Sequence, residues 1–301
     1  MGAKTLEDYV PLDKSWTIDM GVLDLLHNYQ DTINFLEKED NLGKDVIALH
    51  KASLNWGAGD NVFVGESGGL FRRLQFASWK DGLNKKFFKQ GTLATREICN
   101  DPNIIYWSLR DLLELDNRTS QWASAKILVD GDWTQVDKLK DSGVKIPHYL
   151  NVTKEALKHW TMKRAQGEVW DPRKDSTIRN QAKAYIGILQ EKRPDFKSEQ
   201  AEDYCFAKVF NYETEEFESL IGHESNRIKS MGEILRVDYT KDKIYSGDHR
   251  VVSAMAMLIK ASNPTWDINQ VKSCFNNTDC VSKAWPLFWE FMNLSDSVKE
   301  I

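Results

Sequence analysis

Apolar residues recur at helical spacing near the start of the chain. Between Lys14 and Leu36 they follow a period of about 3.6 residues, which predicts one long helix. Residues 45–56 repeat the pattern and predict a second helix. The run NVFVG, Asn61–Gly65, is short and apolar and precedes a glycine turn, so it predicts a buried strand. Short strands separated by helices indicate a mixed α and β class.

Two further helical stretches lie in the middle of the chain. NVTKEALKHW at 151–160 predicts a helix whose N-cap is Asn151 or Thr153. Residues 164–197 form a charged helical stretch, and its expected apolar face includes Trp170, Ile178 and Tyr185. Because proline stops a helix, the segment around Pro194 is the expected crossing between two domains.

Composition narrows the class of protein. The chain has 301 residues, 41% hydrophobic and 28% charged, a length that predicts about two domains. Its formal charge of -5 argues against a nucleic-acid binder. No apolar run approaches the ~20 residues of a membrane span, and the first residues show no secretory pattern. We therefore expect a cytoplasmic protein without nucleic-acid or membrane partners.

The cysteines and tryptophans say less about the class of protein. The four cysteines are too scattered for a disulfide framework, and none lies in a zinc-binding spacing, so no metal is expected. The 11 tryptophans are spread along the whole chain. Since each buries a large area, we expect them to serve packing.

Small polar residues immediately precede an apolar helix at three places. These are GESGGLFRRLQFASW (65–79), RTSQWASAKIL (118–128) and SGDHRVVSAMAMLIKA (246–261). The first turn of a helix presents unpaired N–H groups and the positive end of the helix dipole, where phosphates and carboxylates bind. Arg72 and Arg73 accompany the first turn, and His249 and Arg250 the third. All three are candidate anion sites.

Each of these clusters also has a simpler explanation. With Asp248 as N-cap, Arg250 lies in a first turn, which is unfavourable unless an anion binds there or a neighbouring carboxylate pairs with it. We weigh these two explanations equally. GESGG alone is more often a tight turn, since it lacks the lysine of a P-loop. Glu224 and Arg227 are three apart and could form a salt bridge on one helix face.

Taken in order, these segments resemble the enolpyruvyl transferase family, most closely its members that act on shikimate-3-phosphate. HESNRI, GDHRVVSAMAML and CVSKAWPLFW are similar to the family's KESxRI, DHRxAMA and CVxKTFPxFF. GESGGLFRRL, TSQWASAKIL and PHYLNVT are similar to NSGTxxRxL, SSQxxSALL and PYxxMT. LATREI is a weaker match to KxRPI, and LDKSWTID resembles KSxxxR. The resemblance covers nearly the whole chain.

The resemblance implies a fold. It is α+β and two-lobed, built of repeated βαβαββ units with helices inside and sheets outside, here with truncated repeats. The first lobe would be discontinuous, 1–13 plus 195–301, and the second would be 14–194, with the active site in the interlobe cleft. Three residues depart from the family pattern: Asp19 replaces an arginine, Gly69 a threonine and His223 a lysine.

The resemblance also implies roles for individual residues. Those that match phosphoenolpyruvate ligands are Lys14, Gly68, Arg96, Gln121, Arg227, Arg250 and Lys283. Those that match ligands of the acceptor are Ser15, Thr119, Ser120, Gln121, Tyr149 and Asp203. The catalytic set is Lys14, Asp203, Glu224, His249 and Lys283. Several cations around one small anion make chemical sense, since its phosphate and carboxylate need separate partners.

The implied reaction transfers the enolpyruvyl group of phosphoenolpyruvate to a hydroxyl of shikimate-3-phosphate or a related anionic acceptor and releases phosphate. This is a step of the shikimate pathway of aromatic amino acid biosynthesis. Asp203 is the candidate base, and Glu224 or Lys283 the candidate acid. No metal or organic cofactor is needed. The partners would be small anions, and the chain a monomer or weak oligomer.

Two other functions remain open. The replacements at Asp19 and His223 favour a catalytically weakened homologue that acts as a binding or interaction protein. The individual residues also have simpler explanations: Asp203 could do no more than cap a helix, and Lys14 and Asp19 could form a solvated charge pair. A related transferase that acts on UDP-N-acetylglucosamine ranks third, because the cysteine usual in its glycine-rich loop is missing here.

Overall fold

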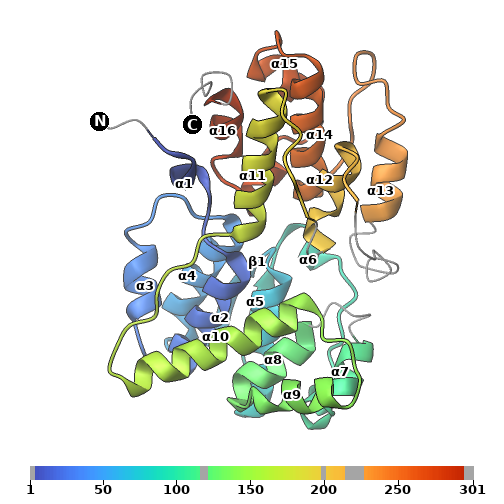
Figure 1. Cartoon of the computed structure of the whole chain (residues 1–301). Coiled ribbons are helices and arrows are strands. Elements are labelled where there is room, and N and C mark those ends of the chain that lie inside the picture. Colours follow the sequence, from blue (N-terminus) through green and yellow to red (C-terminus); the bar gives the residue numbers. More distant parts are fainter. Residues whose placement is uncertain (1–3, 116–120, 198–200, 214–226, 295–301) are drawn as a thin grey trace. The chain divides into compact units, whose positions relative to one another are not determined.

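The computed structural model describes residues 4–115, 121–197, 201–213 and 227–294 (Figure 1). The chain divides into two compact units. Unit 1 comprises Met1–Pro11 and Lys174–Ile301, and unit 2 comprises Leu12–Arg173. The structure is mixed α and β but mostly helical, and its described strands form one two-stranded sheet in unit 2.

Unit 2 is built around helix α2. Its elements are α2 (Lys14–Leu26), α3 (Asp31–Leu36), α4 (Lys44–Trp56), β1 (Asn61–Gly65), α5 (Gly68–Lys80), β2 (Lys86–Lys89), α6 (Gly91–Ala94), η1 (Pro102–Tyr106), α7 (Leu109–Leu115), α8 (Gln121–Asp130), α9 (Thr134–Asp141) and α10 (His148–Ala165). Helix α2 packs against α4, α5 and α10, and α5 packs against α8. The predicted helix at 45–56 and the predicted strand at 61–65 are confirmed.

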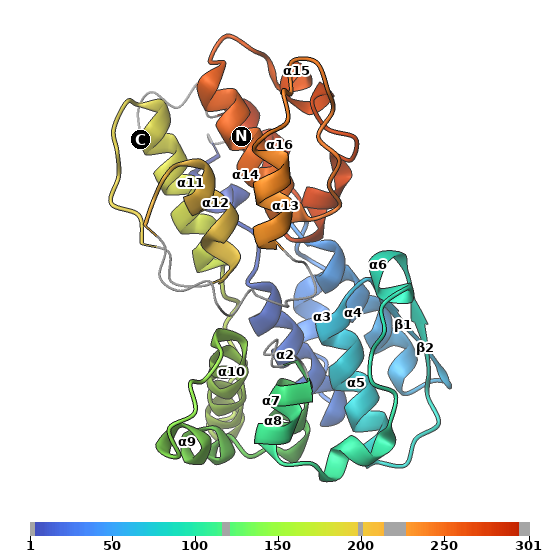
Figure 2. The same ribbon diagram turned by 90° about the vertical axis from the view of Figure 1, so that its right-hand side faces the viewer.

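The sheet of unit 2 is a single parallel pair. Asn61 lies opposite Lys86 and Phe63 opposite Phe88, and α5 makes the crossover between the strands (Figure 2). Val62 is fully buried on the β1 strand, which packs against α4. The described residues thus contain one βαβ unit, and the repeated βαβαββ units with outer sheets are not found among them.

The long helix predicted from Lys14 to Leu36 is wrong, because the chain breaks after α2. Asn28 adopts a left-handed backbone conformation, with φ of 61°. The carboxylate of Asp24 accepts hydrogen bonds from the backbone N–H (3.0 Å) and the hydroxyl (2.6 Å) of Thr32. These bonds compete with helix continuation and start α3 in a new direction.

The predicted caps of the 151–160 helix are also wrong. Helix α10 begins at His148 after Pro147, so Asn151 and Thr153 lie inside it. Proline is well suited to a helix start because its φ is fixed and its missing N–H is not needed there. The Thr153 hydroxyl instead donates to the Tyr149 carbonyl (3.1 Å) and accepts from the Arg73 guanidinium (3.2 Å).

The stretch 164–197 is not one helix with one apolar face. Helix α10 ends at Ala165, and α11 (Ser176–Leu189) starts under the cap of Asp175, whose carboxylate accepts the Ile178 N–H at 2.9 Å. Trp170 packs in the core of unit 2, whereas Tyr185 packs in the core of unit 1. The chain therefore passes between units at Arg173–Lys174 and not at Pro194.

Unit 1 surrounds helix α14. Its elements are α1 (Leu6–Tyr9), α11, η2 (Ala201–Asp203), α12 (Tyr204–Val209), α13 (Arg227–Ile234), α14 (His249–Ser262), α15 (Ile268–Ser273), η4 (Asp279–Lys283) and α16 (Phe288–Leu294). Helix α14 packs against α11, α12, α13, α15 and η4. The N-terminal segment is part of this core, since Tyr9 is buried and its carbonyl accepts the Trp285 indole N–H at 2.8 Å.

The packing role predicted for tryptophan is confirmed at several positions. Trp122 and Trp285 are almost completely buried, and Trp170 lies in the core of unit 2. Within the described part of the chain, the helices are all too short or too polar to cross a membrane. The same residues contain no group of three His, Cys, Asp or Glu side chains placed to hold a metal ion.

Candidate active site

In unit 2 the start of α5 gathers two guanidinium groups and an amide. Ser67 caps the helix by accepting the Leu70 N–H, and Gly68 is its first residue. A side chain built at Gly68 would place its Cβ 3.1 Å from Nη1 of Arg72, 3.5 Å from Oε1 of Gln121 and 3.6 Å from Nη1 of Arg96. Gly68, Arg72, Arg96 and Gln121 form the glycine-68 cluster. Three of its members were predicted as ligands of phosphoenolpyruvate.

The fourth member, Arg72, is marked by the sequence only as a cation near the first turn of the helix. Helical side chains tilt toward the N-terminus, so a residue four positions on covers the first turn. Arg72 accordingly donates to the Gly68 carbonyl (3.4 Å) and to Oε1 of Gln121. Its guanidinium also lies 5.8 Å from the centre of the Trp122 ring, a cation–π distance. Arg72 links the starts of α5 and α8.

Arg96 reaches the cluster from the segment after α6. Its Nη2 donates to the Thr92 hydroxyl at 3.3 Å. The turn before it depends on Gly91, which has a φ of 50° and whose Cβ position would fall 2.2 Å from the Glu66 carboxyl carbon. The positive φ favours glycine here, and a side chain would also displace the Glu66 carboxylate.

Lys14 occupies the first position of α2. Asp13 caps this helix by accepting the Trp16 N–H at 3.0 Å. A lysine there opposes the helix dipole. The Lys14 ammonium lies 3.4 Å from the carboxylate of Asp45, a buried residue in the first turn of α4. Ser15 follows in the same turn and is half-buried.

Asp19 does not pair with Lys14, so the solvated charge pair is wrong. Its side chain is fully buried and accepts a hydrogen bond from Nε of Arg73. Burial raises the pKa of the Asp19 carboxyl, and the Arg73 guanidinium opposes that rise. Asp19 thus joins α2 to α5, and Arg73 extends the connection to Thr153 of α10. The charge of Asp19 therefore helps to hold the helices of unit 2 together.

The remaining acceptor residues of unit 2 are only partly placed. Tyr149 lies half-buried in the first turn of α10, where its carbonyl accepts the Thr153 hydroxyl. Gln121 begins α8 and belongs to the glycine-68 cluster. Thr119 and Ser120 lie outside the described residues.

Unit 1 holds a second polar cluster at the starts of α13 and α14. Nε of Arg227 donates to Oδ2 of Asp248 at 3.0 Å, and Oδ1 of Asp248 accepts the Arg250 N–H at 2.8 Å. Asp248 is therefore the N-cap of α14, as predicted. Nη2 of Arg250 donates to the Glu202 carboxylate. We call Glu202, Arg227, Asp248 and Arg250 the arginine–carboxylate cluster.

The electrostatics of this cluster follow from its burial. Burial raises the pKa of Asp248, but Arg227, His249 and the hydrogen bond from the Arg250 N–H outweigh it and hold that pKa well below its usual range. Burial also raises the pKa of the adjacent Cys205 thiol to about 12. Asp248 is therefore ionised, and Cys205 is a neutral packing residue rather than a nucleophile.

Asp203 precedes α12 without capping it. No cap hydrogen bond from its side chain is present. Instead, Oδ1 accepts the amide Nε2 of Gln181 at 2.7 Å, and both residues are buried. The simpler explanation, a carboxylate that only caps α12, is wrong. Asp203 is a buried acid held in a fixed orientation by a neutral donor from α11.

His249 is the first residue of α14, and Lys283 belongs to a neighbouring element. Nδ1 of His249 lies 4.0 Å from Oδ1 of Asp248, in the first turn of the helix. Lys283 ends η4, which packs against α14. Glu224, the other candidate acid, lies outside the described residues, as do His223 and the predicted Glu224–Arg227 pair.

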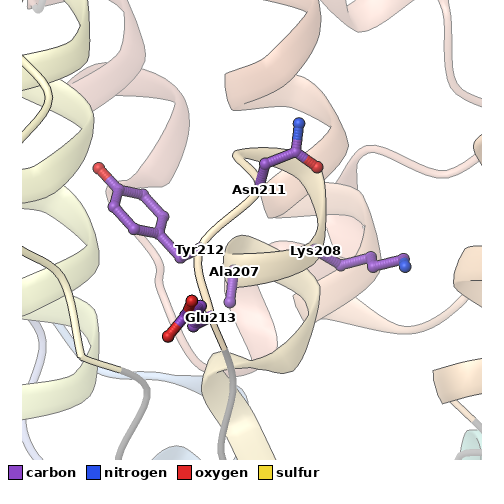
Figure 3. Close-up of a pocket in the computed structure, with 5 residues that line it drawn as sticks. All are labelled: Ala207, Lys208, Asn211, Tyr212 and Glu213. Atoms are coloured by element: carbon purple, nitrogen blue, oxygen red, sulfur yellow. The ribbon is translucent and has the colours of Figure 1, made fainter.

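A hollow of about 220 Å³ lies at the far end of α12 (Figure 3). It is lined by Ala207, Lys208, Asn211, Tyr212 and Glu213. In Figure 3 the Tyr212 ring and the Lys208 side chain point to opposite sides. None of the predicted site residues lines the hollow. The predicted residue on this helix, Asp203, lies at its N-terminal end. This hollow is separate from both clusters.

Three residues that contact the predicted site residues were not assigned from the sequence. Arg72 had a usable signal, the spacing of four residues from Gly68. Gln181 and Glu202 had none, because they lie 22 and 48 residues from their partners Asp203 and Arg250. Comparison with known proteins adds no homologue: no protein-family model, no curated protein and no solved structure matches the chain.

Proposed function

We propose that the chain is an enolpyruvyl transferase that binds phosphoenolpyruvate through its helix starts. The glycine-68 cluster is the observation that carries the proposal. It combines a helix N-terminus, two guanidiniums and an amide around a position where a side chain would intrude. Helix N–H groups and guanidiniums are the groups that bind phosphate and carboxylate most effectively in proteins.

Residues of unit 1 would supply the chemistry. Asp203, held by Gln181, removes the proton of the acceptor hydroxyl as its oxygen attacks the central carbon of phosphoenolpyruvate. Glu224 or Lys283 protonates the methylene carbon. The resulting tetrahedral ketal then loses a methyl proton and expels phosphate, which leaves the enolpyruvyl ether. Arg227 and Arg250 stabilise negative charge on the transferred group.

The acceptor is proposed to be shikimate-3-phosphate or a related anionic alcohol. The support for this finer assignment is the order of the motifs, with Ser15, Gln121 and Tyr149 at matching positions. The negative charge of Asp19 would not repel such an acceptor, because Asp19 is paired with Arg73 inside unit 2.

A second function is favoured by one observation. Arg227 and Arg250 are each paired with a carboxylate of the same unit. Such pairs stabilise a fold without any ligand, as expected for a weakened homologue that binds anions but turns nothing over. The two functions differ in one result, the release of phosphate.

The test combines calorimetry with a phosphate-release assay. We expect phosphoenolpyruvate to bind, and phosphate to appear when shikimate-3-phosphate is added. Gly68→Ala should weaken phosphoenolpyruvate binding by about 10-fold or more, since its Cβ crowds the Arg72 guanidinium. Gly57→Ala is the matched control, because nothing lies within 4 Å of its Cβ position.

The outcomes separate the alternatives. Binding with turnover supports the transferase, and binding without turnover supports the binding protein. If phosphoenolpyruvate does not bind, or if Gly68→Ala binds it as well as Gly57→Ala does, the proposed anion site in unit 2 is wrong.

A further inference from the structure

The two arginines of the arginine–carboxylate cluster have carboxylate partners of different kinds. Asp248 is fixed by the helix that follows it: Oδ1 accepts the Arg250 N–H at 2.8 Å while Oδ2 accepts from Arg227. Removing this carboxylate from Arg227 would also uncap α14. The pair between Arg227 and Asp248 is therefore part of the fold.

Glu202 is held differently. It belongs to the three-residue helix η2, and its carboxylate contacts Nη2 at the far end of the Arg250 side chain. Glutamate has one more rotatable bond than aspartate, and this side chain is 12% exposed. Rotation about its own side-chain bonds can withdraw it from Arg250 without uncapping α14, whose cap is Asp248.

We propose that Glu202 is an exchangeable internal counter-ion, which occupies the place on Arg250 that an anionic ligand takes over. The proposal rests on the proposed function, because it requires Arg250 to bind the ligand. The Arg250 side chain is 5% exposed, so its charge needs a partner in either state. Glu202 supplies that partner when no ligand is bound, and a phosphate or carboxylate supplies it afterwards.

This arrangement makes Glu202 a determinant of specificity. A ligand must outcompete a carboxylate that is already in place, so its attraction to the guanidinium must exceed that of one carboxylate. A dianionic phosphate meets this condition better than a singly charged acid. Glu202 thereby selects phosphorylated ligands, and it lowers the affinity of the Arg250 site for every anion.

The experiment measures binding of phosphoenolpyruvate and of inorganic phosphate by calorimetry. In Glu202→Gln the charge is lost and the shape is kept, and both ligands should bind about 10-fold more tightly, the range of one charge-assisted hydrogen bond. The selectivity for phosphate over acetate should fall. Glu233→Gln is the control: it removes the same charge from an exposed site on α13, where Glu233 faces Lys229.

A double-mutant cycle tests whether Glu202 acts through Arg250. In an Arg250→Met background, Glu202→Gln should no longer change the affinity. Should Glu202→Gln fail to fold, Glu202→Asp, which keeps the charge but shortens the reach, should also bind the ligands more tightly than the wild type.

Unchanged or weaker binding in a folded Glu202→Gln variant overturns the inference, while the wild type still binds phosphoenolpyruvate and the proposed function stands. A gain equal to that of Glu233→Gln also overturns it, since the effect is then one of net charge. If neither the wild type nor any variant binds the ligands, the proposed function fails together with the inference.

Discussion

At the scale of single residues, the polar side chains of unit 1 are distinguished by what holds them. Asp248 is held by a helix and by Arg227, and Asp203 accepts a hydrogen bond from the neutral amide of Gln181. An amide donor orients a carboxylate without neutralising its charge. This suits a general base, which must be ionised before reaction and correctly oriented.

Replacing Gln181 tests this role. In Gln181→Leu the side-chain size is nearly kept and the donor is lost. We expect kcat to fall by about 10- to 100-fold with little change in KM for phosphoenolpyruvate, because orientation matters in the transition state.

The control for this variant is Gln190→Leu, which changes the same side chain in the residue that follows α11. Steady-state rates at varied phosphoenolpyruvate concentration provide the measurement of kcat and KM. An unchanged kcat in Gln181→Leu would assign Gln181 to packing alone.

At the scale of elements, one buried ion pair joins α2 to α5. Asp19 and Arg73 are both buried, and the guanidinium also contacts Thr153 of α10 and the Gly69 carbonyl (3.1 Å). Three helices therefore meet at one guanidinium. The enolpyruvyl transferase pattern would predict an arginine at position 19. This chain has an aspartate there, which pairs with Arg73.

Asp19→Asn should reduce the free energy of unfolding by about 3–5 kcal/mol, because Arg73 is left as a buried charge without its counter-ion. Urea denaturation measures the loss. Replacing both residues with leucine should recover much of it, since no charge is then buried. Asp238→Asn breaks an exposed pair with Lys241 and should leave the urea midpoint unchanged. A small effect of Asp19→Asn would show that water reaches Arg73.

The start of α14 offers a second prediction at this scale. A depressed pKa in the folded state means that Asp248 stabilises the fold above the unfolded pKa of ~3.9 and loses this contribution as pH falls toward the folded value. Asp248→Asn keeps an N-cap but loses the charge that pairs with Arg227. It should cost about 1–3 kcal/mol at pH 7, and the difference from the wild type should shrink below about pH 4.

Urea unfolding at several pH values between 3 and 7 gives this difference directly. Asp267→Asn is the control, since Asp267 also caps a helix, α15, through backbone N–H groups. A difference for Asp248→Asn that persists undiminished at pH 3 would contradict the assignment.

At the scale of the whole molecule, each unit has its own core. Unit 2 is continuous in sequence, and its clusters include Leu23, Leu70 and Trp122. Unit 1 is discontinuous, and Tyr9 and Val10 complete its core together with residues from α11 onward. Cutting the chain at the unit boundary should therefore affect the two units differently.

We expect the fragment Leu12–Arg173 to fold alone and to unfold in one cooperative transition by circular dichroism. The fragment Lys174–Ile301 should be less stable than unit 1 in the full chain, because Tyr9, Val10 and the partner of the Trp285 indole are missing. Adding the peptide 1–11 should restore part of this stability. A fragment 12–173 without a cooperative transition would show that unit 2 depends on unit 1.

The sequence by itself determined local structure wherever one short signal sufficed. The helix at 45–56, the strand at 61–65 and the Asp248 cap follow from periodicity and cap chemistry within a few residues. The family resemblance singled out Gly68, Gln121 and Arg96, and the structure brings these three residues together.

Only the tertiary structure decided which polar side chains pair and where the helices and units end. The break after α2 depends on Asp24 contacting Thr32, and α11 belongs to unit 1 because its apolar face meets a core formed largely by later residues. The partners of Asp19, Asp203 and Arg250 lie 22 to 54 residues away. Periodicity reports which face of a segment is buried, but not which distant charge meets it, because that is fixed by packing.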